Sequence, residues 1–121
     1  ALAAHPDVSG VSFTGSQAAG AAVALATLAR QARVQLEMGG KNPLVIMADA
    51  DLERAVEVAL DGAYYSCGQR CTASSRLIVE DAIHDTFVAA LTQRVAQLAV
   101  GDARDPGAQI GPQVSQAQLE R

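Results

Sequence analysis

Stretches that favour strands alternate with stretches that favour helices along this chain, and glycines mark several of the junctions between them. The first third contains a β-prone run, a helix-forming run and a second β-prone run, at residues 11–14, 17–29 and 33–38. Gly15 ends the first run, and Ser16 is a residue type that caps helices well. Gly39 and Gly40 stop the third run. A strand, a glycine turn, a helix and a second strand form a βαβ unit, so this part predicts two parallel strands.

The same alternation continues to the end of the chain. Further strands are expected at residues 43–47 and 76–79, and a helix is expected from about residue 83 to residue 99. Between the strands lies a helix with Asp49 or Asp51 as its cap. Its apolar stripe has helical spacing and consists of Leu52, Ala55, Val56, Ala59, Leu60 and Ala63. The composition of residues 64–69 and 101–114 predicts that both segments are loops. The predicted fold class is α/β.

Composition narrows the class of protein. Half of the 121 residues are hydrophobic, which suits a folded domain with one modest core. The formal net charge of −4 argues against a nucleic-acid partner, because such partners require clustered Lys and Arg. No apolar run approaches the length of a membrane span, and the first residues lack the pattern of a secretion signal. We therefore expect a soluble, cytoplasmic protein that binds neither nucleic acid nor membrane.

The ends and the cysteines give two further expectations. The chain starts without Met in a loop-like run, AHPDVSG, and stops in a polar run, so both ends read as cuts in a longer protein. Cys67 and Cys71 are too few for a disulfide scaffold. Neither cysteine has a second Cys or His pair with which to hold zinc, so no metal site is expected.

Three features suggest chemistry. The first is the turn of Gly15 and Ser16, where a strand runs into a helix. Unpaired amides and the helix dipole make such a turn an anion site, suited to phosphate. An ordinary tight turn explains the same residues, so this feature leaves both interpretations open.

Glu37 and Cys71 are the other two features. Glu37 stands at the end of a predicted strand before Gly39, where a carboxylate has room to swing towards a reacting centre. A solvated charge at a strand edge is the alternative. Cys71 follows Arg70, and a neighbouring cation favours a reactive thiolate, whereas Cys67 follows two tyrosines. The alternative for either cysteine is a buried small hydrophobe.

Three motifs occur in an order that resembles the aldehyde dehydrogenase superfamily: FTGS, then LEMGGKNP, then GQRCTA. The resemblance covers the whole chain, from HPDVSGVSFTGS to the IGPQVS segment. The sequences of the segments LEMGGKNP and GQRCTASSR are most similar to those of the branch that oxidises 2,5-dioxopentanoate (α-ketoglutarate semialdehyde).

The resemblance implies part of the aldehyde dehydrogenase fold, divided between two domains. Residues 1–39 correspond to the C-terminal part of a Rossmann-like NAD(P)-binding domain, and residues 40–121 to the N-terminal part of an α/β catalytic domain. It also implies NAD or NADP as cofactor, an aldehyde as substrate, and a parent protein that is a homo-oligomer, either a dimer or a tetramer. The family's oxyanion asparagine and its ribose contacts lie outside the 121 residues, so the isolated chain is expected to be inactive.

Site residues follow from the same resemblance. Cys71 matches the family's catalytic nucleophile, and Glu37 matches its general base. The residues that match cofactor-binding positions are Gly15, Ser16, Met38 and Gly39. Met38 stands where leucine is commoner, which is a volume-conserving change. Cys67 matches no catalytic position.

Two alternatives from other classes stay open on the sequence. One is a non-catalytic binding or structural module that keeps the same fold. The presence of both Cys71 and Glu37 counts against it, because loss of either is how such a descendant is recognised. The other is a thiol-redox protein that uses Cys67 and Cys71.

Overall fold

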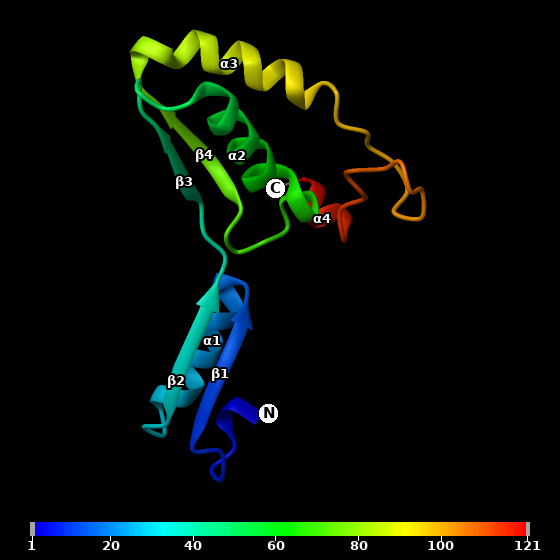
Figure 1. Cartoon of the computed structure of the whole chain (residues 1–121). Coiled ribbons are helices and arrows are strands. Elements are labelled where there is room, and N and C mark those ends of the chain that lie inside the picture. Colours follow the sequence, from blue (N-terminus) through cyan, green and yellow to red (C-terminus); the bar gives the residue numbers. More distant parts are fainter. Residues whose placement is uncertain (1, 121) are drawn as a thin grey trace. The chain divides into compact units, whose positions relative to one another are not determined.

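The computed structural model describes residues 2–120 and divides the chain into two compact units, Ala1–Gly40 and Lys41–Arg121. The first unit, here called unit 1, begins with a short 3-10 turn, η1 (Leu2–Ala4). The second, unit 2, contains two helices of more than three turns and a two-stranded sheet. Figure 1 shows the order of the elements along the chain.

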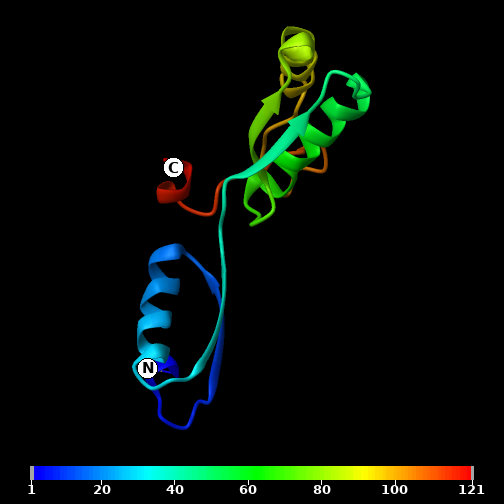
Figure 2. The same ribbon diagram turned by 90° about the vertical axis from the view of Figure 1, so that its left-hand side faces the viewer.

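Unit 1 is the βαβ unit that the sequence predicts. Strand β1 (Gly10–Gly15) is followed by helix α1 (Gln17–Leu28) and strand β2 (Arg33–Met38). The two strands are parallel and in continuous register, from Gly10 opposite Arg33 to Gly15 opposite Met38. Figure 2 shows α1 along one face of this strand pair.

Helix α1 starts where the sequence places it, because Ser16 caps it. The Ser16 hydroxyl accepts a hydrogen bond from the Ala19 N–H at 3.2 Å, which satisfies one of the free amides of the first turn. The apolar residues of α1 surround most of the helix, a pattern typical of packing between layers. Within residues 2–120, however, only one side of α1 is covered, and Leu25 and Leu28 are 69% and 73% exposed.

Unit 2 pairs strand β3 (Asn42–Ile46) with strand β4 (Ser74–Val79), again in parallel. Between them the chain forms helix α2 (Leu52–Tyr64) and a short 3-10 segment, η2 (Tyr65–Gly68). Helix α3 (Asp81–Val95) and a single helical turn, α4 (Gln116–Leu119), follow β4. These elements confirm the α/β class.

The core of unit 2 forms where α2 and α3 pack against the sheet. Its buried residues are Ile46, Val56, Ala59 and Phe87. Val56 and Ala59 belong to the apolar stripe predicted for α2, and Asp51 rather than Asp49 caps that helix, accepting from the Arg54 N–H at 2.9 Å.

Helix α3 differs from the prediction at both ends, because it begins two residues earlier and ends at Val95 rather than near residue 99. After Val95 the main chain forms tighter turns, such as the hydrogen bond from the Leu98 N–H to the Val95 carbonyl. Apolar residues spaced three apart occur in such turns as well as in an α-helix. The spacing of apolar residues therefore predicted a helix that continues beyond Val95. None of the helices formed by residues 2–120 combines the length and hydropathy that a membrane span requires.

Candidate active site

The turn between β1 and α1 has the features of an anion site. The first turn of α1 contains no acidic residue, so the positive end of the helix dipole is not neutralised by its own sequence. Gly15 and Ser16 are exposed at this turn. A Cβ atom at Gly15 would lie 2.6 Å from the Phe13 ring, so a side chain at this position would force that ring to move. The arrangement suits a phosphate group against the start of α1.

Glu37 and Met38 end the strand beside that turn. In the parallel register, Glu37 lies opposite Thr14 and Met38 opposite Gly15. The carboxyl ends of both strands and the start of α1 therefore meet at one edge of unit 1, where α/β sheets usually bind their ligands. The Glu37 side chain is exposed there.

Met38 packs against α1 at Gly20, where the helix has no side chain. Gly20 is buried, and a Cβ atom in its place would lie 2.5 Å from the Met38 sulfur. The missing side chain thus lets α1 approach the end of β2 closely. Gly39, which follows, has open space around it, since a Cβ atom there would meet nothing within 4 Å. The structure brings together Gly15, Ser16, Glu37, Met38 and Gly39.

Cys71 belongs to unit 2 and sits in a tight turn before β4. The Ala73 N–H donates to the Arg70 carbonyl at 3.1 Å, which closes the turn around Cys71 and Thr72. The Cys71 side chain is exposed and its thiol is free. Within residues 2–120, no main-chain carbonyl accepts a hydrogen bond from the Cys71 N–H. An exposed thiol and a main-chain N–H without a carbonyl partner among residues 2–120 therefore occur together at this turn.

Three consecutive residues ahead of this turn adopt left-handed backbone. The φ angles of Ser66, Cys67 and Gly68 are 53°, 57° and 69°. This conformation is unfavourable for side chains other than glycine and costs about 1–2 kcal/mol per residue. Hydrogen bonds offset part of that cost, because the Gln69 N–H donates to the Ser66 carbonyl and the Gln113 amide donates to the Cys67 carbonyl. The sequence analysis identified these residues only as a loop.

Cys67 differs from Cys71 in what surrounds its sulfur. Its Sγ accepts a hydrogen bond from the Gly111 N–H at 3.2 Å and lies 3.5 Å from the Gly111 carbonyl oxygen. The residue is half-buried, and its thiol is free. A further bond from the Val114 N–H to the Gln69 side-chain oxygen joins the same two segments. Cys67 thus packs the segment that follows α3 against the loop before Cys71.

Arg70 supports the end of α2. Its Nη2 donates to the Asp61 carbonyl at 2.8 Å, and its guanidinium lies 4.7 Å from the centre of the Tyr65 ring. The Asp61 carbonyl also accepts from the Tyr65 N–H, and the same Nη2 lies 3.4 Å from the Gly62 carbonyl oxygen. A cation at this place stabilises the negative end of the helix dipole. The sequence interpretation, in which Arg70 serves mainly as a cation beside Cys71, did not include these contacts.

Asn42 is a residue that the sequence analysis missed. Its side-chain amide nitrogen lies 2.6 Å from the Cys71 carbonyl oxygen and 3.2 Å from the Ala73 carbonyl oxygen. Asn42 belongs to the LEMGGKNP motif, and a second signal is the proline that follows, because Pro43 has no N–H to contribute to the strand pairing.

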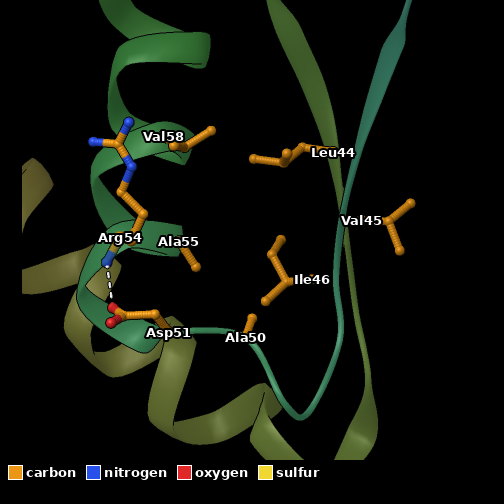
Figure 3. Close-up of a pocket in the computed structure, with 8 residues that line it drawn as sticks. All are labelled: Leu44, Val45, Ile46, Ala50, Asp51, Arg54, Ala55 and Val58. Atoms are coloured by element: carbon orange, nitrogen blue, oxygen red, sulfur yellow. Dashed lines mark hydrogen bonds between the residues drawn. The ribbon is translucent and has the colours of Figure 1, made fainter.

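An apolar hollow of about 200 Å³ lies between β3 and α2 (Figure 3). Leu44 and Ile46 point into it from alternate positions of β3, while Val45 between them points away. None of the site residues predicted from the sequence lines it. Among residues 2–120, no group of three or more His, Cys, Asp or Glu side chains is arranged to hold a metal ion.

Comparison with known proteins gives a consistent result. The Aldehyde dehydrogenase family matches residues 1–121. The α-ketoglutaric semialdehyde dehydrogenase of Bacillus subtilis is 46% identical over 119 residues, which are 98% of this chain and 24% of that protein. A betaine aldehyde dehydrogenase of Sinorhizobium fredii is 44% identical over 99% of this chain and 25% of its own length.

Solved structures agree with these sequence matches. The crystal structure of betaine aldehyde dehydrogenase from Staphylococcus aureus in complex with NAD+ has a TM-score of 0.94 and 38% identity, covering 98% of this chain and 24% of that one. An NADP-dependent enzyme of E. coli has a TM-score of 0.94 and 36% identity, covering 98% and 25%. The chain spans about a quarter of the length of these relatives.

Proposed function

The chain belongs to the aldehyde dehydrogenase family, and we propose that it carries the nucleophile, the general base and part of the cofactor site of an enzyme that oxidises an aldehyde to a carboxylate. The observation that carries the proposal is the Cys71 thiol, exposed in a closed turn beside a main-chain N–H that no carbonyl of residues 2–120 accepts from. The cofactor is NAD or NADP. Relatives named for different aldehydes match at 43–46% identity, so the proposed substrate is an aldehyde as a class.

The two parts of the chain have different tasks in this proposal. Residues 1–39 form the C-terminal part of the NAD(P)-binding domain, and residues 40–121 form the N-terminal part of the catalytic domain. The change of compact unit after Gly40 supports a division at this place.

Cofactor binding is assigned to Gly15, Ser16, Met38 and Gly39. The start of α1 offers main-chain amides and an uncompensated dipole to a pyrophosphate. Gly15 and Gly39 leave the backbone accessible to a ligand, and Met38 adds an apolar surface that Gly20 allows to pack closely. When bound, NAD or NADP supplies the acceptor for the hydride that leaves the aldehyde carbon.

Cys71 forms the covalent bond to substrate. Its thiolate attacks the aldehyde carbon, so a C–S bond forms while the carbonyl electron pair moves to the oxygen. The Cys71 N–H is suited to donate to that oxyanion, and one such donor is typically worth about 10²–10³ in rate. Loss of hydride from the same carbon leaves an acyl group on Cys71 as a thioester.

Glu37 acts in the second half of the reaction. Its carboxylate removes a proton from a water molecule, which attacks the thioester carbon and expels the Cys71 thiolate as the carboxylate product forms. Exposure of Glu37 at the end of β2, before two glycines, gives the side chain the freedom that this task requires.

The test of the proposal compares the two cysteines in the full-length protein. Cys71→Ala should abolish aldehyde oxidation because no C–S bond can form, whereas Cys67→Ala should leave most of the activity. Steady-state rates of NAD(P)H formation measure both. An active Cys71→Ala variant beside an inactive Cys67→Ala variant would overturn the assignment.

The same pair of variants separates the other two functions considered. A thiol-redox protein needs both sulfur atoms, so either substitution would abolish its activity. A non-catalytic module would show no aldehyde oxidation in the unsubstituted protein.

A further inference from the structure

Asn42 connects the start of β3 to the turn that carries Cys71, although 29 residues separate them in the chain. Its side-chain amide donates to the Cys71 carbonyl at 2.6 Å and to the Ala73 carbonyl at 3.2 Å. An amide group has two N–H bonds, so the two acceptors use its full donor capacity. Both atoms that Asn42 holds belong to the main chain of the Cys71 turn.

The strand pairing explains why a side chain performs this task. Asn42 lies opposite Ser74, but Pro43 lies opposite Arg76, so the register shifts by one residue between them. Pro43 lacks an N–H, and regular pairing is interrupted where β4 begins. The Asn42 side chain supplies donors at this irregularity, with a partly buried bond to Ala73 and an exposed bond to Cys71.

We propose that Asn42 is a positioning residue for Cys71, an inference that rests on the proposed function of that thiol. By holding the Cys71 and Ala73 carbonyls, Asn42 fixes the peptide planes that follow Cys71 and Ala73. The first of these planes includes the Cys71 Cα, so it constrains the direction in which the Cys71 sulfur projects. Attack on an aldehyde carbon depends on that direction, and a displacement of about 1 Å is enough to cost on the order of 10²-fold in rate.

The chemistry of the contact gives a specific order of variants. Asn42→Ser keeps one donor, Asn42→Ala removes both, and Asn42→Asp keeps the shape while placing a carboxylate against two carbonyl oxygens. Positioning through hydrogen bonds therefore predicts that Asn42→Ser keeps the most activity, Asn42→Ala keeps less, and Asn42→Asp keeps the least. Packing alone predicts a different order, because Asp has nearly the volume of Asn and would then be the mildest change.

Gln113→Glu is the matched control. The Gln113 amide also donates to a carbonyl of the same loop, that of Cys67, at 3.1 Å. The control makes the same change from amide to carboxylate, but against the carbonyl of Cys67, which lies four residues before the nucleophile. It should lower activity only a few-fold, since the Cys67 carbonyl does not belong to the turn that presents Cys71.

The experiment measures two quantities in the full-length protein. One is the rate of the first NAD(P)H burst with a short aldehyde, and the other is the rate at which iodoacetamide alkylates Cys71, located by peptide mass. Asn42→Asp should slow the burst about 10²-fold, with the KM for cofactor nearly unchanged, and should alter the alkylation rate as well. If Asn42→Asp does not fold, the comparison of Asn42→Ser with Asn42→Ala decides the question.

The inference is overturned if Asn42→Asp retains the burst and the alkylation rate, or if Gln113→Glu changes them equally. Failure of the proposed function looks different. In that case Cys71→Ala would keep its turnover, while the alkylation rate of Cys71 in the Asn42 variants would still report whether Asn42 holds the turn.

Discussion

At the scale of single residues, two cysteines four positions apart have different surroundings. The Cys67 sulfur contacts the main chain of Gly111, whereas Cys71 is exposed in its turn. A sulfur that is held in place by packing and hydrogen bonds is less available to a substrate than an exposed one. This contrast supports the assignment of the nucleophile to Cys71.

Glu37→Gln should spare the first step and slow the second, because an amide cannot take a proton from water. We expect a burst of NAD(P)H close to one equivalent, followed by turnover reduced roughly 10²–10⁴-fold. Stopped-flow absorbance measures both phases. If the burst disappears while the protein stays folded, Glu37 does not act mainly in thioester hydrolysis.

The sequence indicated some residues of the site and not others, for a physical reason. Cys71 and Glu37 lie within runs of neighbouring residues that form recognisable motifs. Asn42 and Arg70 lie within the same LEMGGKNP and GQRCTA motifs, but they act through the main-chain carbonyls of Cys71 and Asp61, which are far along the chain or at the end of another element. Such contacts depend on how β3, α2 and β4 pack, and no local pattern encodes them.

At the scale of elements, periodicity and caps predicted most of the fold. The limits of β2 agree with the sequence prediction, α1 begins at the predicted residue, and α2 carries its predicted stripe. The left-handed run of Ser66, Cys67 and Gly68 was not predicted. Two of its three residues have side chains that disfavour this backbone, so it depends on contacts with the segment after α3 rather than on local preference.

Gly68→Ala should loosen the loop that precedes Cys71. Alanine would have to adopt a φ of 69°, and its Cβ would lie 2.8 Å from the Ala63 carbonyl oxygen. A cost of about 1–2 kcal/mol is expected for the backbone alone, which corresponds to roughly 5–30-fold faster local opening. Hydrogen–deuterium exchange of residues 65–71 in the full-length protein measures it.

Gly111→Ala is the control for that measurement. A Cβ atom at Gly111 would make ordinary contacts, 3.7 Å from Ala103 and 3.8 Å from the Cys67 sulfur. It touches the same loop without demanding left-handed backbone, so exchange of residues 65–71 should change little. Equal acceleration in both variants would show that Gly68 is not required for its backbone conformation.

At the scale of the whole molecule, the chain exposes much apolar surface. Within residues 2–120 each sheet has only two strands. Large apolar side chains are exposed on both units, among them Leu25, Leu28, Val45 and Ile78. Exposed surfaces of this kind and open strand edges promote association. The relatives, of which this chain spans about a quarter, contain further residues beyond the matched part.

The 121-residue chain alone should therefore bind NAD and NADP weakly and show no measurable turnover. It carries the proposed nucleophile, base and pyrophosphate turn, but loss of even one further oxyanion donor costs about 10²–10³ in rate. Calorimetric titration with both cofactors, followed by an assay with a short aldehyde, tests this against the full-length protein. Tight binding with near-normal turnover would show that these residues suffice.

The proposed reaction depends on an acyl group that is bound to Cys71 between its two steps. An acid quench of the Glu37→Gln variant after one burst, followed by peptide mass mapping, locates that group. We expect the mass of the acyl group on the peptide that contains Cys71 and no modification of Cys67. A full burst with the acyl group on Cys67, or with no acyl group on either cysteine, would contradict the proposed reaction.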